Sequence, residues 1–291
     1  MKQAILITAY KNAQQIYDIV DFFGKEFEFY IHIDVKSKLC LPDLAIYENV
    51  HIYKEYVVNY ASENHLKAIL FLSERALTHQ DNYYFHLITG QDFPIKSKNY
   101  FTQQLNTSKD YIEYRCLPSD MWADGSGGLN RIQHYHFLNI FNLRFKIKIG
   151  IGKLHKIMCK IQQILKFKRK HSLLSYYPAL YGGSTYWSLK RNSLQFIVDS
   201  ANDHVIKSID HTFCVEEIFI QTVLLNSDYK NNVVNDNLRY IDWVSGRGGY
   251  PGFLDETDYE NLVYTNCLFA RKFHENSSEG LKSMLLTLLC E

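Results

Sequence analysis

Acidic residues are missing from a long stretch of this chain. No Asp or Glu lies between Asp124 and Asp199, whereas thirteen of the 32 Lys and Arg residues fall there. The basic charge is densest over residues 142–171, where apolar residues alternate with Lys. A basic amphipathic segment of this kind indicates either peripheral contact with an anionic membrane or a solvated helix face, and both interpretations stay open. No nucleic-acid-binding motif accompanies the charge, so nucleic acid is not an expected partner.

Long apolar runs and paired cysteines are also absent. Nowhere do 18 apolar residues follow one another, so we expect neither a membrane span nor a signal peptide. The six cysteines are scattered without a CxxC motif, which argues against a zinc site or a disulfide framework. A reducing compartment fits this pattern. We therefore expect a cytoplasmic protein, located at the inner face of the cell membrane if the basic segment binds lipid.

Strand-like runs alternate with helix-like patterns along the 291 residues, of which 46% are hydrophobic. We predict strands at residues 3–9, 27–34, 50–54, 83–89 and 238–243, and helices at 13–23, 62–79, 213–227 and 278–289, with Ser62 as a candidate N-cap. The alternation predicts one α/β domain over residues 1–291, with a mainly parallel sheet flanked by helices on both faces. In such sheets ligands bind beyond the carboxyl ends of the strands. The expected nucleotide site thus comprises Thr8–Tyr10, His32–Asp34 and Gly90–Asp92.

Three side chains at these strand ends carry chemistry of their own. His32 and Asp34 lie two residues apart on a strand and point to one face, a spacing compatible with a metal pair. No third ligand accompanies them, so a carboxylate that hydrogen-bonds a nucleoside is the favoured role for Asp34. Asp92 stands without the second acid that holds Mg²⁺ or Mn²⁺ against a diphosphate, and it is either a ligand contact or a turn residue before Pro94.

Further candidates lie in the second half of the chain. Glu216 and Glu217 are adjacent on a predicted helix, so their side chains diverge by roughly 100° and only one can face a given cleft. Periodicity alone places Glu217 in solvent. Arg247 lies among Gly246, Gly248 and Gly249, a combination compatible with a phosphate cradle, and Arg271 and Lys272 form an adjacent basic pair further along the chain. Neither group forms a P-loop or a dinucleotide fingerprint.

Taken together, the segments resemble the core-2/I-branching β-1,6-N-acetylglucosaminyltransferase family, which includes peptide O-xylosyltransferases. The matching stretches are YIHIDVKS (30–37), YYFHLITGQDFPIKS (83–97), YGGSTYWSLKR (181–191), CVEEIFIQTVL (214–224), RYIDW (239–243) and LFARKF (268–273). The resemblance implies a GT-A type, Rossmann-like fold, a UDP-sugar donor, inversion at the anomeric carbon, and no metal or other cofactor.

Site residues carry over from the matching stretches. The family's catalytic base is the second acid of a Pro-Asp-Glu-like step and falls on Glu217, although Val215 and Glu216 replace the usual Pro and Asp. The basic pair that neutralises the diphosphate falls on Arg271 and Lys272, with Arg247 as a further basic residue. The remaining predicted donor contacts are Ala9, Tyr10, Asp34, Gln91 and Asp92, which lie at the expected strand ends, and the predicted acceptor contacts are Glu113, Gly183 and Trp243.

The sequence therefore predicts an inverting, metal-independent glycosyltransferase that moves a GlcNAc- or xylose-like sugar onto a glycan hydroxyl in bacterial surface polysaccharide synthesis. Residues 1–110 form the expected nucleotide-binding half and residues 111–291 the acceptor and catalytic half. The basic segment favours a lipid-linked acceptor. One alternative is a glycosidase, which needs two carboxyls about 5–9.5 Å apart. Another is a carbohydrate-binding or scaffold protein with a degenerate transferase fold.

Overall fold

The computed structural model describes residues 2–104, 109–120, 122, 125–139 and 151–290. Its centre is a seven-stranded sheet in the order β10-β6-β9-β4-β1-β2-β3. The strands are β1 (Lys2–Ala9), β2 (Phe27–Ile33), β3 (Val50–Tyr53), β4 (Asn82–Thr89), β6 (Asp110–Ile112), β9 (Trp187–Lys190) and β10 (Val233–Val234). Only β9 runs antiparallel to its two neighbours, β4 and β6. The predicted α/β architecture, a mainly parallel sheet flanked by helices, is confirmed.

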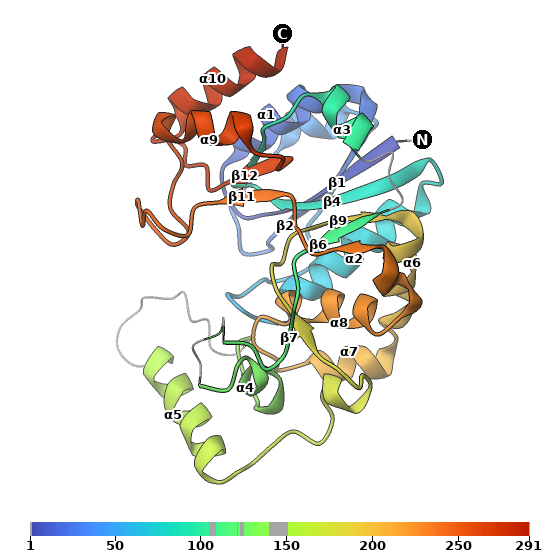
Figure 1. Ribbon diagram of the computed structural model, residues 1–291, viewed down its shortest axis with the longest axis vertical. Coiled ribbons are helices and arrows are strands. Elements are labelled where there is room, and N and C mark those ends of the chain that lie inside the picture. The colour runs from blue at the N-terminus through green and yellow to red at the C-terminus, as the bar shows by residue number, and fades with distance from the viewer. Residues whose placement is uncertain (1, 105–108, 121, 123–124, 140–150, 291) are drawn as a thin grey trace.

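Helices cover both faces of this sheet (Figure 1). One face carries α1 (Ala13–Phe23), α3 (Lys98–Gln104), α9 (Tyr259–Tyr264) and α10 (Glu279–Cys290), and the other carries α2 (Asn64–Thr78), α6 (Arg191–Ser200), α7 (Asp203–Ile209) and α8 (Phe219–Leu225). The described residues also form two smaller sheets. One contains β11 (Arg239–Ile241), β12 (Phe269–Arg271) and β5 (Asp92–Pro94), and the other contains β7 (Arg115–Cys116) and β8 (Tyr181–Gly182). The short α4 (Leu129–Gln133) and the outlying α5 (Ile151–Ile164) lie at the lower edge of Figure 1.

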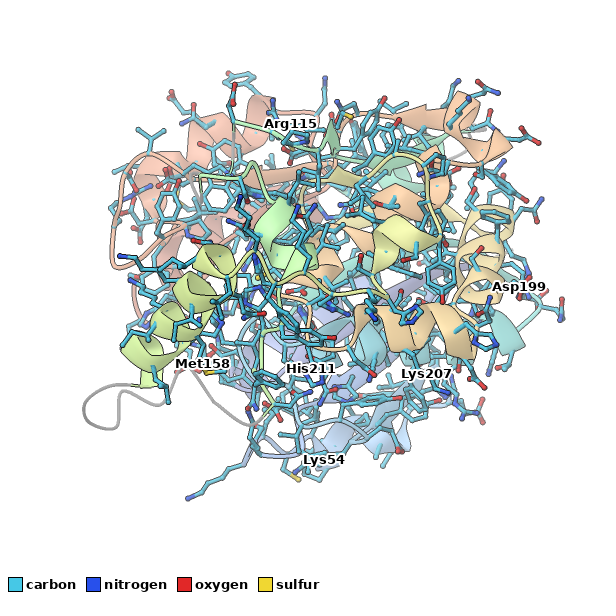
Figure 2. All side chains as sticks on the ribbon, turned by 90° about the horizontal axis from the view of Figure 1, so that it is seen from below. Lys54, Arg115, Met158, Asp199, Lys207 and His211 are labelled. Carbon is cyan, nitrogen blue, oxygen red and sulfur yellow. The ribbon has the colours of Figure 1, made fainter. Side chains whose placement is uncertain are left out.

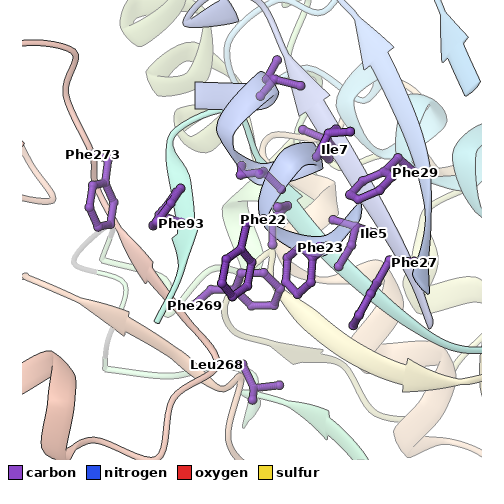
Figure 3. Packing of buried hydrophobic residues seen from close by; sticks show 14 of the residues in the cluster. Ile5, Ile7, Phe22, Phe23, Phe27, Phe29, Phe93, Leu268, Phe269 and Phe273 are labelled. Atoms are coloured by element: carbon purple, nitrogen blue, oxygen red, sulfur yellow. The ribbon is translucent and has the colours of Figure 1, made fainter. Parts of the chain in front are cut away.

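Alternate residues of β1 feed two separate hydrophobic cores. Ile5 and Ile7 face the core beneath α1, whereas Ala4 and Leu6 face the core beneath α2. Because both faces are covered, β1 reads as a continuous apolar run rather than as an alternating one. Phe23 lies at the centre of the first core and packs against a ring of other phenylalanines (Figure 3). This packing makes the sheet a rigid platform for the side chains at its strand ends.

Most predicted elements agree with the structure, with three corrections. Glu63 rather than Ser62 precedes α2, and no side chain caps this helix. The predicted strand at 238–243 is β11, which belongs to a small separate sheet. The predicted helix at 213–227 is broken: a 3₁₀ turn covers Val215–Glu217, and α8 begins only at Phe219. Among the described residues, none of the helices has the length and apolar character that crossing a bilayer requires.

Candidate active site

A cleft of about 580 Å³ opens at the carboxyl ends of β1, β2 and β4. Thr8 pairs with His32 on one side and with Thr89 on the other, so the three strand ends stop at one level. The chain passes from β1 to β2 and β3 on one side and then returns to place β4 on the other. This reversal of strand order is where open α/β sheets bind their ligands, which agrees with the position of the cleft.

One wall of the cleft comes from the predicted nucleotide site. Ala9, Tyr10, Asp34 and Gln91, four of the residues predicted to contact the donor, all line it. The Asp34 carboxylate accepts hydrogen bonds from the backbone N–H groups of Lys36 (3.0 Å) and Val58 (3.2 Å), which fix its orientation. The buried side-chain amide nitrogen of Gln91 has no hydrogen-bond partner within the described part of the chain. It is therefore available to donate to a bound ligand.

His32 is not available as a metal ligand. Its Nε2 accepts a hydrogen bond from the backbone N–H of Tyr56 at 3.0 Å. Burial lowers the pKa of His32 to about 4, so the ring is neutral and Nδ1 carries its proton. Since neither nitrogen offers a free lone pair, the structure speaks against the alternative of a metal held by His32 and Asp34.

Asp92 lies beneath the cleft rather than in its wall. The side chain is fully buried, and its Oδ2 accepts hydrogen bonds from the backbone N–H and the hydroxyl of Thr89. Its Oδ1 lies 3.3 Å from Nε of Arg271. The predicted donor contact is therefore corrected: Asp92 closes the turn after β4 and positions Arg271, and it does not reach the cleft.

Arg271 and Lys272, the predicted basic pair, line the cleft beside the end of β4, where Arg271 of β12 pairs with Asp92 of β5. The Arg271 guanidinium lies over the ring of Tyr186, 4.4 Å from the ring centroid, and faces Asp92 from the other side. Burial lowers the pKa of Arg271 below its ordinary range, but Asp92 opposes this shift and the group stays charged. The ring and the carboxylate together hold one positive charge in a fixed place within the cleft.

Glu216 and Glu217 both line the cleft, which corrects the prediction that only one of them would do so. The reason is the break in the expected helix. The backbone N–H of Gly183 donates to the Glu217 carbonyl at 2.8 Å, and Cys214 adopts a left-handed conformation at φ 48°. The resulting 3₁₀ turn lies across the cleft wall, and Glu217 remains 31% exposed while Glu216 is buried.

Arg131 forms an ion pair with Glu217, with its Nη1 2.7 Å from Oε2. Its guanidinium lies over the Trp122 ring at 4.1 Å. A Cβ on Gly128 or Gly182 would come within about 2 Å of that ring, so both glycines leave room for it. Partial burial and the neighbouring Glu216 raise the pKa of Glu217 to about 7, and Arg131 opposes the rise.

His65 connects the two walls of the cleft. Its Nδ1 lies 3.2 Å from Oε1 of Glu216, and its Nε2 lies 3.2 Å from Oγ1 of Thr8. Sequence reasoning missed both His65 and Arg131, because their partners lie 151 and 86 residues away and no local motif marks them. The cleft thus combines Glu217, whose pKa is raised, the cations Arg271 and Lys272, and Asp34 at the end of β2. This set is suited to group transfer from a phosphate-linked donor.

Comparison with known proteins decides the family. Residues 4–261 match the family described as Branch: Core-2/I-Branching enzyme. The chain belongs to the core-2/I-branching enzyme family. Xylosyltransferase 1 of Mus musculus is 23% identical over 91% of this chain and 31% of its own length. A beta-glucuronosyltransferase of Arabidopsis thaliana is 30% identical over 98 residues, which are 32% of this chain and 22% of its own length.

This core-2/I-branching chain therefore spans a third or less of each of these two relatives. Among solved structures, the bifunctional glycosyltransferase WbbM in its apo state is similar to it with a TM-score of 0.38 and 10% identity. That match covers 95% of this chain and 46% of the other.

The acceptor residues assigned from the core-2/I-branching resemblance do not line the cleft. Gly183 bonds to the backbone of Glu217, and a Cβ there would lie 2.2 Å from the Glu113 carbonyl oxygen. The Glu113 carboxylate accepts a hydrogen bond from Asn237 at 3.1 Å. Trp243 is half exposed and packs against Tyr250. Gly183 thus positions the 3₁₀ turn that carries Glu217, and no ligand role follows from the surroundings of Glu113 or Trp243.

Arg247 is also corrected. It does not line the cleft, and its guanidinium forms ion pairs with Asp242, Asp255 and Asp258 at 2.6–3.3 Å. These carboxylates raise the pKa of Arg247 above its ordinary range. A cation already balanced by three acids stabilises its own loop and is poorly placed to neutralise a diphosphate.

The basic segment 142–171 is described from residue 151 onward, and residues 142–150 lie outside the described residues. The expectation that the whole segment presents its basic side chains to a partner is wrong for Arg169. Arg169 is buried, and its guanidinium donates to the Ile132 carbonyl, the Ser208 carbonyl and the Thr212 hydroxyl. It is therefore a structural residue, whereas Lys156, Lys160, Lys166, Lys168 and Lys170 are exposed.

Proposed function

We propose that this protein is an inverting glycosyltransferase that moves a sugar from a UDP-sugar to a carbohydrate hydroxyl. The observation that carries the proposal is that Glu217 and Arg271 line one cleft at the switch point of the sheet. In an inverting transfer the acceptor hydroxyl attacks the anomeric carbon as UDP leaves from the opposite face. The reaction needs one base for the attacking hydroxyl and positive charge for the departing diphosphate, and membership of the core-2/I-branching enzyme family supports a transfer reaction in general.

Glu217 is the proposed base. A carboxylate with a pKa near 7 holds a proton far more strongly than an ordinary glutamate, yet it is largely ionised just above neutral pH. Arg131 donates a hydrogen bond to one of its oxygens, Oε2, and so fixes the orientation of the carboxylate. The other oxygen can then accept a proton. General-base assistance of this kind is typically worth about 10²–10⁴ in rate.

Arg271 and Lys272 are the proposed groups that stabilise the leaving UDP. Preorganised positive charge in a partly enclosed cleft stabilises the charge that develops as the glycosidic bond breaks. We propose that no metal ion is needed. Two contacts support this: Asp92, the acid nearest the end of β4, is engaged by Thr89 and Arg271, and Asp34 is engaged by two backbone N–H groups.

The donor sugar is proposed to be GlcNAc or a xylose-like sugar, by analogy with the family description and the xylosyltransferase relative. We propose a glycan acceptor, carried on a lipid during surface polysaccharide synthesis at the cytoplasmic face of a bacterial membrane. The support for the membrane lies in α5. Leu154, Ile157, Ile161 and Ile164 form one stripe on this helix and are 44%, 53%, 48% and 70% exposed.

The helix α5 docks by its polar side and leaves its apolar side outward. Gln162 accepts from the Tyr135 backbone N–H at 2.8 Å and donates to the Tyr135 carbonyl at 3.0 Å. The exposed stripe lies about a third of a turn away, and Lys156 and Lys160 lie on the side of the stripe away from Gln162. A helix at the molecular edge with an outward apolar stripe and flanking lysines is suited to the interface of an anionic bilayer. Figure 2 shows this helix, with Met158 labelled, at one side of the molecule.

A donor screen tests the proposed activity. The purified protein is incubated with UDP-GlcNAc, UDP-xylose or UDP-glucuronic acid and oligosaccharide acceptors, and the released UDP is measured, with Glu217→Gln as the matched blank. Release that requires both acceptor and Glu217, with inverted configuration in the product, supports the proposal. Hydrolysis of glycosides without use of any UDP-sugar would identify a glycosidase, and UDP binding without turnover would identify a scaffold.

A further inference from the structure

Two histidines and a cysteine meet where α5 packs against the chain that precedes it. Nδ1 of His136 lies 3.0 Å from Nε2 of His155, and Sγ of Cys159 lies 3.7 Å from each of these nitrogens. His136 is buried and the other two are partly buried. His155 and Cys159 are one helical turn apart, so both side chains leave α5 on one side.

We propose that His136, His155 and Cys159 bind a zinc ion that clamps α5 to the body of the protein. In a tetrahedral site the Zn–N bonds are about 2.0–2.1 Å and the Zn–S bond is about 2.3 Å, which places the donor atoms roughly 3.3–3.6 Å apart. The three observed separations lie within a few tenths of an ångström of this range. Only small side-chain rotations are needed to admit the ion, and a water molecule can supply the fourth ligand.

The hydrogen bonds around His136 already select its metal-binding tautomer. Nε2 of His136 lies 3.1 Å from the backbone carbonyl oxygen of Asn130, and a carbonyl can only accept. Nε2 therefore carries the proton, and the lone pair on Nδ1 points to the cluster. A second ring nitrogen that donates to a backbone carbonyl is the usual support of a metal-binding histidine.

Zinc would replace the contacts that the three side chains now make with one another. Nε2 of His155 donates its proton to Nδ1 of His136 in the metal-free cluster. On binding, the His155 proton moves to Nδ1 of its own ring, and the Cys159 thiol releases its proton to solvent and becomes a thiolate ligand. One proton is released for each ion bound, so the affinity rises with pH.

The proposed clamp lies between the exposed helix and the cleft. The ring of Phe213 contacts the rings of both histidines, with centroids 5.5 Å from His136 and 6.1 Å from His155. Phe213 precedes Cys214, which lines the cleft. Apart from Gln162, the cluster supplies the main polar attachment of the described part of α5, so an ion here would fix the direction in which the apolar stripe points.

A second trio offers a matched control. Glu28, His51 and His79 also bring three possible ligand atoms within 4.8 Å of one another. The Glu28 carboxylate is already paired with the Lys2 ammonium at 2.6 Å, which competes with any metal ion. Loss of His51 should therefore leave zinc binding unchanged, and loss of the exposed Cys40 controls for a surface thiol.

The test uses the whole chain, freed of metal with a chelator, dialysed and titrated with Zn²⁺ in a calorimeter. We expect one Zn²⁺ per chain with a Kd at or below about 1 µM. C159A and H155A should each weaken binding by at least about a hundredfold, whereas H51A and C40A should not. Co²⁺ should give a thiolate charge-transfer band that C159A abolishes, and Zn²⁺ should slow hydrogen exchange in α5. The proposal would be overturned if the wild-type protein did not bind stoichiometric Zn²⁺. It would also be overturned if C159A and H155A, with unchanged circular dichroism, bound Zn²⁺ as tightly as the wild-type protein does.

Discussion

Arg131 and Glu217 are joined by an ion pair of 2.7 Å that connects two parts of the chain 86 residues apart. Four influences act on this carboxyl: partial burial and the charge of Glu216 raise its pKa, and Arg131 and His65 lower it. The net result is a group that changes protonation near neutral pH, where a general base is most effective. The pH dependence of the reaction is therefore the most direct probe of the site.

Removal of the Arg131 charge should move the activity to higher pH. For the wild-type protein we expect kcat/KM to rise through an apparent pKa near 7, because only the ionised Glu217 accepts a proton. In R131M the pKa of Glu217 rises, so the rising limb of the profile moves upward and activity at neutral pH falls. R131K should keep much of the charge and move the limb less. The measurement is kcat/KM from pH 5 to 9, and an unmoved limb in R131M would remove Glu217 as the titrating group.

Replacement of the two adjacent glutamates should give different results. E217Q removes the base and should lower kcat by about 10²–10⁴ while UDP binding stays nearly intact. E216Q keeps the base and removes a charge that raises the pKa of Glu217. The rising limb of its pH profile should therefore move to lower pH, and its activity at the optimal pH should stay within about tenfold of wild type. Single-turnover kinetics and UDP titration separate the two effects. Equal losses of kcat in the two variants, or a large loss in E216Q alone, would contradict the assignment.

The cations in the cleft should matter more than the cation outside it. Charge-assisted hydrogen bonds are worth about 1.5–3 kcal/mol, so R271A or K272A should cost at least about tenfold in kcat/KM with the donor sugar. R247M is the matched control, since Arg247 faces three carboxylates away from the cleft. It should lower thermal stability and leave kcat/KM within about threefold of wild type. A loss of kcat/KM in R247M as large as that in R271A would indicate that Arg247 contacts the donor after all.

Chelation should leave the chemical step nearly unchanged. Asp92 offers its oxygens to Thr89 and Arg271, so we expect weak binding of Mg²⁺ or Mn²⁺ at the end of β4. Transfer to a small soluble acceptor should keep most of its rate in excess EDTA, and added Mn²⁺ should not raise it. The proposed zinc clamp does not alter this expectation, because its ligands lie outside the cleft. The assay uses H155A in parallel, and activity abolished by EDTA and restored by Mn²⁺ in both proteins would show that transfer depends on a metal.

The sequence predicts the framework well because local patterns determine it. The helix at 13–23 is found with the predicted bounds, since its apolar residues recur with helical spacing and a glycine follows them. The convergence of Ala9, Tyr10, Asp34 and Gln91 at one cleft also follows from the sequence, because strand ends in a parallel sheet meet at one edge. The residues around Glu217 could not be predicted from the sequence. Arg131 and His65 reach Glu217 and Glu216 only through tertiary packing, and neither carries a local signature.

The broken helix at 213–227 shows the same limit. Its apolar spacing is helical throughout, yet the Glu217 carbonyl bonds to Gly183 and Cys214 bonds to Ala61, so contacts from distant segments override the local preference. Arg247 and Asp92 illustrate a second limit. Residue type and neighbouring glycines mark a charged group as a phosphate contact, but the number of counter-charges around it is known only once the fold is built.

The outward stripe of α5 leads to the last prediction, which concerns membranes. An apolar stripe and nearby lysines bind an anionic bilayer through buried area and through about 1 kcal/mol for each basic residue near the surface. The protein should therefore co-sediment with vesicles that contain phosphatidylglycerol at low salt, and less so at high salt. A variant with Ile157 and Ile161 changed to Gln should bind more weakly at all salt concentrations. A variant with Lys156, Lys160, Lys166 and Lys168 changed to Gln should chiefly lose the salt-dependent part.

The control for these variants lies within the same segment. Arg169 is buried and bonded to Ile132, Ser208 and Thr212, so R169Q should lower the melting temperature while the folded protein binds vesicles as wild type does. Transfer to a small soluble acceptor should be unchanged in the stripe and lysine variants, because α5 does not line the cleft. Vesicle binding that fails in the wild-type protein at low salt, or that survives both sets of substitutions, would show that the stripe faces a different partner.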